Sequence, residues 1–163
     1  MINSKVEAAL NDQIRKEFYS SYLYLSMAAR FNSLNLKGFA KWMKVQAGEE
    51  TKHGMKIYDF VEARNGKVVL QQINAPPAGQ KSAREMFEEA SQHERMVTES
   101  IDKIVELARA EKDNATEVFL QWFVSEQVEE EASANEIWEK LKLIGDSAPT
   151  LLMLDAELGK RAA

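Results

Sequence analysis

Cysteine is absent from this sequence, and proline and glycine are scarce, with three and seven residues respectively. The lack of cysteine excludes disulfides, zinc ribbons, iron–sulfur clusters and cysteine nucleophiles. A formal net charge of −5 leaves no basic footprint for nucleic acid. No apolar run approaches the roughly 20 residues that a membrane span requires. The first residues, Met1–Glu7, lack the apolar block of a secretory signal, so we expect a cytoplasmic protein.

The residues that are abundant are alanine, glutamate, lysine, leucine and glutamine, which are good helix formers. A chain of 163 residues suits one domain with one substantial core. We therefore expect an all-α fold in which residues 1–163 form a single domain. It comprises a four-helix bundle over 4–145 and a short C-terminal helix within 147–160, starting near Thr150.

Helix boundaries are marked by capping residues. Asn3 or Ser4 is expected to cap the first helix, and the second should run from about Lys37 to Arg64. Ser82 opens a capping box for the third helix, and Asp113 is expected to cap the fourth. Short connections within each pair predict two antiparallel helical hairpins.

The connector between the second and third helices is long, at roughly 17 residues. Fully extended, it could cover roughly 55 Å, whereas a helix of about 28 residues is roughly 42 Å long. This length predicts a crossover that makes the third helix run parallel to the second. Val68, Val69, Leu70 and Ile73 are expected to pack on the bundle. A flexible linker between two hairpins is the alternative.

The second helix carries an unusual inward stripe. Its residues recur in steps of three and four, which is the spacing of one helical face: Phe39, Met43, Gln46, Glu50, His53, Ile57 and Phe60. Glu50 and His53 therefore occupy positions where packing calls for leucine or isoleucine. Unpaired buried charge is costly, and a metal ion is the usual partner for such a pair.

The other long helices also carry polar residues in the middle of their apolar stripes. Glu17, Glu94 and Gln127 lie about 11 to 13 residues into their helices, or roughly 17–20 Å along the axis, and Glu130 follows Gln127 by one turn. In a bundle they would converge with Glu50 and His53 in one cross-section. Four carboxylates there cannot all stay ionised without countercharge. Carboxylate oxygens with a single imidazole suit iron or manganese better than zinc, which predicts a dinuclear iron site bridged by Glu50.

These residues resemble those of bacterial and archaeal non-haem ferritins along nearly the whole chain. The matching stretches are Glu17–Tyr24, Glu49-Glu50-x-x-His53, His93-Glu94, and Trp122 with the run Glu126–Glu131. The resemblance implies a ferritin-like bundle that stores iron. Fe(II) would be oxidised by O₂ or peroxide at a ferroxidase centre and deposited as ferric mineral inside a shell of 24 subunits.

The resemblance also implies the iron ligands. One ferroxidase iron would be held by Glu17, Glu50 and His53. The second would be held by Glu50, Glu94 and Glu130, with Gln127 close by.

A third iron position would use Glu49, Glu126, Glu129 and Glu130. Tyr24 matches a tyrosine that can supply an electron to oxygen, and Trp122 is expected to play a related part. Acidic runs are usually solvated helix faces. For Glu49, Glu126 and Glu129, the alternative that they form only such a face therefore stays open. His93 is expected at the surface or in an interface.

Two departures from related patterns refine this interpretation. The fourth helix has Gln127-x-x-Glu130 in place of a second Glu-x-x-His, so the second iron has only oxygen ligands and is expected to bind more weakly. Thr51 stands where bacterioferritins have a haem-ligating methionine, so no haem is expected. Rubrerythrins have a similar core but need cysteines for their second iron centre, and this sequence has no cysteine.

Three alternatives remain at this stage. A di-iron oxidase or peroxidase would need a substrate pocket beside the metals. A DNA-protecting mini-ferritin usually lacks the fifth helix. A purely structural bundle would become more stable if Glu50 and His53 were replaced by apolar residues.

Overall fold

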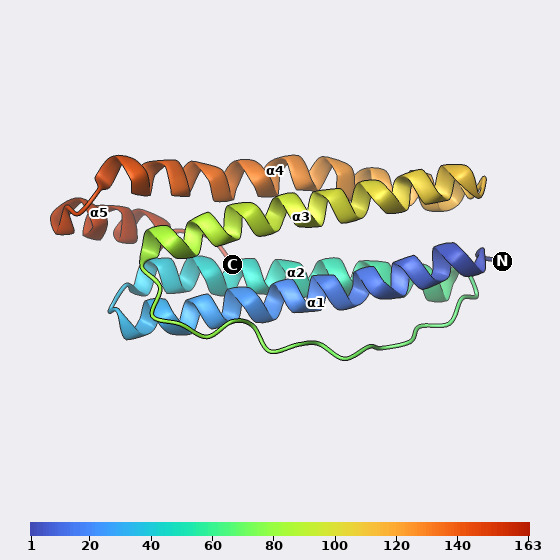
Figure 1. Cartoon of the computed structure of the whole chain (residues 1–163), viewed down its shortest axis with the longest axis horizontal. Helices are drawn as coiled ribbons and strands as arrows, with labels where there is room; N and C mark the ends of the chain where they lie inside the picture. Colours follow the sequence, from blue (N-terminus) through green and yellow to red (C-terminus); the bar gives the residue numbers. More distant parts are fainter.

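The computed structural model describes all 163 residues and contains five helices. They are α1 (Ser4–Ser33), α2 (Lys37–Ala63), α3 (Ala83–Ala110), α4 (Asn114–Ile144) and α5 (Ala148–Leu158). The four long helices lie side by side, and α5 lies at one end of the bundle (Figure 1). The expected all-α four-helix bundle with a short fifth helix is therefore confirmed. No helix combines the length and the apolar character needed to cross a membrane.

The connection between α2 and α3 runs along the outside of the bundle from one end to the other (Figure 1). Consequently α2 and α3 run in the same direction, and the predicted crossover is confirmed. Asn11 holds the start of this connection, because its amide donates to the Lys67 carbonyl at 2.9 Å and accepts from the Val69 N–H at 2.7 Å.

The expected packing of the crossover was partly wrong. Val69 and Leu70 are 49% and 68% exposed, whereas Val68 packs against the core and Ile73 is half-buried. The segment forms no regular strand, so its side chains do not alternate strictly between the bundle and solvent, and the neighbours Val69 and Leu70 are both exposed. The side chains that point away from the bundle remain exposed in the single chain.

The caps of the long helices match the sequence predictions. Asn3 accepts hydrogen bonds from the first turn of α1, Ser82 forms a capping box with Glu85, and Asp113 accepts from Thr116 N–H. The start of α5 differs. It begins at Ala148, two residues before the expected position, because Ser147 caps it and a proline fits its first turn.

Hydrophobic side chains form two separate clusters in the bundle. One cluster lies toward the α5 end and includes Phe31, Phe39 and Phe87. The other lies toward the opposite end and includes Ile57 and Leu120. Neither cluster includes the buried polar residues at mid-height in the four long helices. A polar layer therefore divides the core in two.

The fifth helix packs against the beginning of α2. The Phe39 N–H donates to the Asp155 carboxylate at 2.9 Å. At Gly38 a Cβ atom would lie 1.7 Å from the Asp155 carbonyl oxygen, so only glycine permits this close approach. Leu154 and Leu158 are buried against the bundle. This contact fixes the direction in which the chain continues beyond α5.

Candidate metal centre

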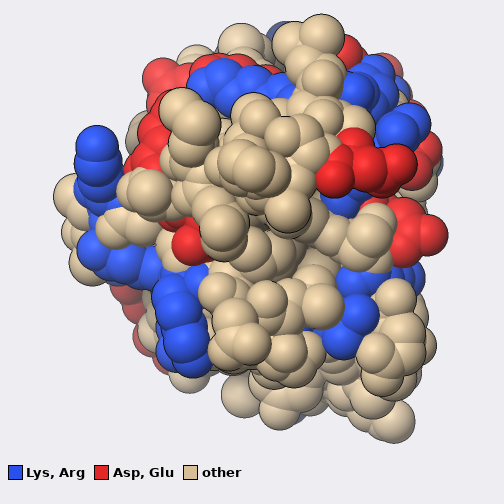
Figure 2. All heavy atoms as spheres, turned by 90° about the vertical axis from the view of Figure 1, so that its left-hand side faces the viewer, with Lys and Arg blue, Asp and Glu red and all other residues tan.

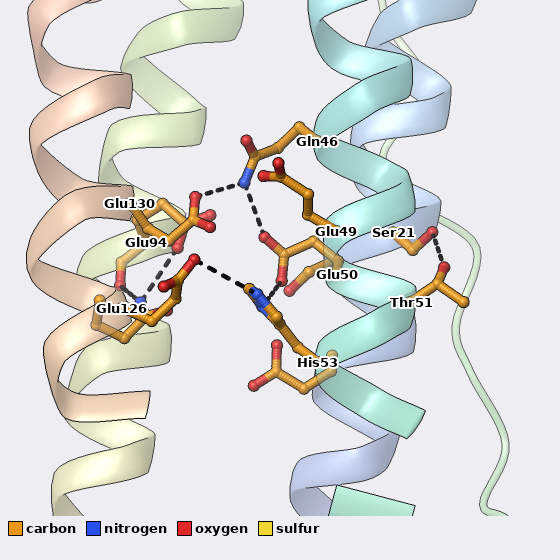
Figure 3. A network of polar contacts seen from close by, with 12 residues as sticks. Ser21, Gln46, Glu49, Glu50, Thr51, His53, Glu94, Glu126 and Glu130 are labelled. Atoms are coloured by element: carbon orange, nitrogen blue, oxygen red, sulfur yellow. Dashed lines mark hydrogen bonds and ion pairs between the residues drawn. The ribbon is translucent and has the colours of Figure 1, made fainter. Parts of the chain in front are cut away.

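The polar layer brings together residues from all four long helices. Its six members are no more than 6% exposed: Glu17 from α1, Glu50 and His53 from α2, Glu94 from α3, and Gln127 and Glu130 from α4. In Figure 3 the side chains of α2 point across the bundle toward those of α3 and α4. The spacing of the polar residues along each sequence stripe thus predicted one shared cross-section, and these side chains do lie in one layer.

Three groups of side chains bring their ligand atoms within 4.8 Å of one another. They are Glu17 with Glu50 and His53, Glu50 with Glu94 and Glu130, and His53 with Glu126 and Glu130. Glu50 belongs to the first two groups, so its two oxygens lie between two potential metal positions. The first group provides one imidazole nitrogen, and the second provides only oxygens. Such donor sets suit iron or manganese.

Burial raises the pKa values of the clustered carboxyls. Desolvation, followed by repulsion from Glu50, raises the pKa of Glu17 from 4.5 to about 8. Desolvation and the neighbouring carboxylates also raise the pKa values of Glu50 and Glu130. One oxygen of Glu17, Oε2, is buried without any hydrogen-bond partner. A cation between these groups would replace the protons and satisfy that oxygen.

On the α3–α4 side, Glu94 is held by two neighbours. The Tyr24 hydroxyl donates to Glu94 Oε1, and Gln127 Nε2 lies 3.2 Å from Glu94 Oε2. The same Gln127 amide also donates to the Glu94 carbonyl and to the Thr98 hydroxyl, both at 3.2 Å. Gln127 therefore acts in this structure as a hydrogen-bond donor beside Glu94.

Two glutamines that the sequence analysis did not assign also contact the cluster. Gln13 Nε2 donates to Glu17 Oε1 at 3.0 Å, and Ser100 donates to Gln13 at 2.6 Å. Gln46 Nε2 donates to Glu50 Oε1 at 3.0 Å and to Glu130 Oε2 at 2.5 Å (Figure 3). Each glutamine lies four residues before a clustered glutamate on the same helix, a spacing that places their side chains together. That spacing was the available sequence signal.

The family model described as "Ferritin-like domain" matches residues 7–144. The chain belongs to the ferritin family. It is 43% identical over 161 residues to a bacterial non-heme ferritin of Bacteroides fragilis (strain 638R), covering 99% of this chain and 100% of that one. A Staphylococcus epidermidis (strain ATCC 35984) bacterial non-heme ferritin is 39% identical, with 99% and 98% covered.

Solved ferritin structures have the same fold as this chain. An engineered closed form of the Archaeoglobus fulgidus ferritin superimposes with a TM-score of 0.98, at 53% identity and with 99% of each chain covered. An open-pore ferritin from the same archaeon also gives 0.98 and 53%, with 99% of this chain and 98% of that chain covered. Iron storage and Fe(II) oxidation are the activities of non-heme ferritins, and the buried glutamate and histidine cluster fits a ferroxidase centre.

The residues expected at a third ferritin iron position are only partly clustered. Glu126 lies beside His53, with its Oε1 3.8 Å from His53 Nε2. Glu49 instead forms a salt bridge with Arg161 at 2.9 Å. Glu129 is exposed and belongs to none of the three ligand groups. The role of these residues as metal ligands stays a prediction.

Two aromatic neighbours of the centre differ in exposure. Trp122 is 40% exposed, its ring centroid lies 5.4 Å from that of His53, and Lys56 lies over it. His93 is half-buried between α1 and α3, where it lines a surface cavity with Lys16 and Tyr19, and its place in an interface stays a prediction. It packs against Tyr19 and Tyr24 and bonds the Ser20 hydroxyl at 2.8 Å. Desolvation lowers the pKa of His93 to about 4, so a neutral ring fits this enclosed position.

Proposed function

We propose that the polar layer is a dinuclear ferroxidase centre with two unequal positions. Glu17, Glu50 and His53 hold the first iron. Glu50, Glu94 and Glu130 hold the second, with Gln127 beside it. The observation that carries this proposal is the sharing of Glu50 between two buried ligand groups. Two cations in these positions would give each of the four buried carboxylates a partner of opposite charge.

Iron is the substrate of this centre and passes through it. Binding of Fe(II) displaces protons from carboxyls whose pKa values burial has raised. Oxidation of two Fe(II) ions releases two electrons, which O₂ takes up with two protons to give hydrogen peroxide. We assign Tyr24 a supporting role as an electron donor, because its hydroxyl contacts Glu94 directly. Trp122, against His53, is assigned a related role.

Iron then leaves toward the mineral. The second position offers only oxygen ligands, so we expect weaker binding there and easier release. Glu49, Glu126, Glu129 and Glu130 form the proposed third position on the exit side. We also propose that haem plays no part, since the Thr51 hydroxyl is bonded to Ser21 and to the Ala47 carbonyl and offers no haem ligand (Figure 3).

A mineral needs a container larger than one bundle. We propose a shell of 24 subunits in the cytoplasm. Large apolar side chains exposed in the single chain support assembly, including Leu70, Leu152 and Met153. The bundle end that carries α5 also presents a broad area without charged residues (Figure 2). These surfaces are suited to contacts between subunits.

The geometry gives less support to a di-iron oxidase acting on an organic substrate. A cleft that reaches Gln127 lies between α3 and α4 and has a volume of about 150 Å³. Sites for small organic molecules usually enclose roughly 300–1,000 Å³. The cleft is large enough for O₂ or peroxide and too small for most organic substrates.

Aerobic addition of Fe(II), with ferric absorbance and particle size recorded together, tests the proposal. We expect rapid oxidation and an iron-filled particle far larger than one 18.5 kDa chain. Oxidation by a monomer or dimer would instead support the oxidase. Combined replacement Glu50→Ala and His53→Leu should reduce oxidation to the rate in buffer. An unchanged rate in that variant would refute the assignment of this centre.

A further inference from the structure

The chain turns back toward the metal centre after α5. Lys41 Nζ donates to the Gly159 carbonyl at 3.1 Å, and Gly159 packs against Gly38. The contact between α5 and the start of α2 thus directs the following residues along α2. Arg161 is the residue that reaches furthest toward the polar layer.

Arg161 contacts three successive turns of α2. Its guanidinium lies 4.3 Å from the Trp42 ring centroid and donates to the Trp42 carbonyl at 3.3 Å. Its Nη2 donates to Gln46 Oε1 at 3.0 Å and to Glu49 Oε2 at 2.9 Å. No other lysine or arginine forms a salt bridge with a predicted iron ligand.

The contact with Gln46 fixes the orientation of that amide. A guanidinium has donors and no acceptor, so it must face the amide oxygen of Gln46. The amide nitrogen then points into the centre, where it donates to Glu50 and Glu130. Arg161 is therefore connected to the two proposed iron positions through a single side chain.

The contact with Glu49 affects a proposed ligand directly. Glu49 precedes Glu50 on α2, and the Arg161 guanidinium that it accepts from also bonds Gln46, which donates to Glu130. A cation beside Glu130, His53 and Glu126 would therefore be attracted to Glu49 as well. Glu49 cannot keep its salt bridge with Arg161 and also turn fully to such a cation.

We propose that Arg161 is a positioning residue that holds Glu49 away from the centre and so weakens the third metal position. The inference rests on the proposed function, because it assumes that two ions bind around Glu50. The Arg161 guanidinium acts as a built-in countercharge for Glu49 when two ions or none are bound. A third ion must displace it, which favours onward movement of iron over its retention at the centre.

Zinc can test this proposal without redox chemistry. Crystals of the assembled protein are equilibrated with graded Zn²⁺, and anomalous scattering gives the occupancy at each position. In Arg161→Gln we expect the position beside Glu49 and Glu126 to reach half occupancy at about tenfold lower Zn²⁺ concentration, because a charge-assisted bond no longer competes. Arg161→Lys should give a smaller shift, since it keeps the charge without the planar fork.

A matched control separates this role from a general charge effect. Lys160→Gln removes the same charge from the adjacent exposed residue, which forms no salt bridge, and should shift the third position by less than about twofold. In a Glu49→Gln background, Arg161→Gln should also have less than about a twofold effect. Equal shifts in Arg161→Gln and Lys160→Gln would overturn the proposal.

The unmodified protein provides an independent measurement. As zinc occupancy beside Glu126 rises, the Glu49–Arg161 salt bridge should open in the same crystals. A third ion that binds while this salt bridge stays intact would overturn the proposal for Arg161 alone. Zinc absent from both positions around Glu50 would instead refute the ferroxidase centre, so the two failures are distinguishable.

Discussion

The two halves of the bundle build the metal centre differently. On the α1–α2 side, Glu50 and His53 lie one turn apart, and Glu17 has a buried oxygen without a partner. On the α3–α4 side, the corresponding turn carries Gln127 and Glu130, and Gln127 donates to Glu94. The first half provides an imidazole nitrogen and an unsatisfied oxygen. The second half provides only carboxylates, both of which already accept hydrogen bonds.

This difference teaches that a pseudo-symmetric fold can hold two unequal metal positions. The position near Glu17 gains a nitrogen ligand and satisfies an orphan oxygen when metal binds, so it should bind more tightly. At the other position a metal must compete with the hydrogen bonds that Tyr24 and Gln127 make to Glu94. Tight binding at one position and weak binding at the other would suit a centre from which iron is released after oxidation.

Removing Glu50 should have the largest effect, because Glu50 belongs to the ligand groups of both proposed positions. Glu50→Gln keeps the size of the side chain but removes the bridging charge, so we expect Fe(II) oxidation to slow by at least about 100-fold. The initial rate of ferric absorbance measures this. Glu62→Gln is the control, since Glu62 is exposed on the same helix. A loss confined to one position in a zinc titration would contradict the bridging role.

The pH dependence of stability should single out the α1–α2 half. A carboxyl whose pKa is raised in the folded state binds more protons folded than unfolded between its two pKa values. For Glu17 this window runs from 4.5 to about 8, so the metal-free protein should lose stability as pH rises through it. Glu17→Gln should therefore be more stable than the original protein at pH 8, by about 4 kcal/mol, with little difference near pH 4.5.

Thermal unfolding of metal-free protein near pH 5 and pH 8 checks this expectation. The stability gain corresponds to a melting-temperature difference of roughly 10 °C at the higher pH. Adding Zn²⁺ at pH 8 should stabilise the original protein more than the variant, because the ion replaces the protons on Glu17. Parallel pH profiles for the two proteins would show that Glu17 is not the group responsible.

Adding a carboxylate to the α3–α4 half should make the two positions more alike. Gln127→Glu replaces an amide donor with a possible ligand, so we expect zinc to bind the second position about tenfold more tightly and iron turnover to slow. Zinc titration and repeated additions of Fe(II) measure the two effects. Gln121→Glu adds the same charge to an exposed site on α4 and should change neither. A weaker second position would mean that repulsion from Glu94 outweighs the new ligand.

The sequence predicted the bundle well because helical periodicity and caps are local properties. The stripes of α1 and α2 required Glu17, Glu50 and His53 to face inward, and a bundle of similar helices placed them at one height. The length of the connector between α2 and α3 also predicted the crossover, because an extended segment of that length can run the whole length of the bundle. Local pattern could not determine which crossover side chains remain exposed, because that depends on how an extended segment turns along the bundle.

Contacts between distant segments escaped the sequence analysis. Arg161 reaches Glu49 only because α5 packs on α2 through Gly38, and nothing near residue 161 in the sequence indicates that contact. The contacts of His93 with the rings of Tyr19 and Tyr24 likewise come from another helix, and the sequence around residue 93 did not indicate them. The inner ring of proposed ligands follows from helix geometry, whereas the surrounding contacts depend on tertiary packing.

The smallest expected effect concerns Tyr24, which comes from α1 but bonds to Glu94 on α3. Tyr24→Phe removes this donor, so Glu94 gains freedom and zinc should bind the second position about threefold more weakly, with the first unchanged. Calorimetric titration with Zn²⁺ measures both steps, and Tyr22→Phe, which alters an exposed tyrosine on the same helix, is the control. Equal weakening of both steps would mean that Glu50 transmits changes between the halves, and the two positions would then have to be treated as one coupled site.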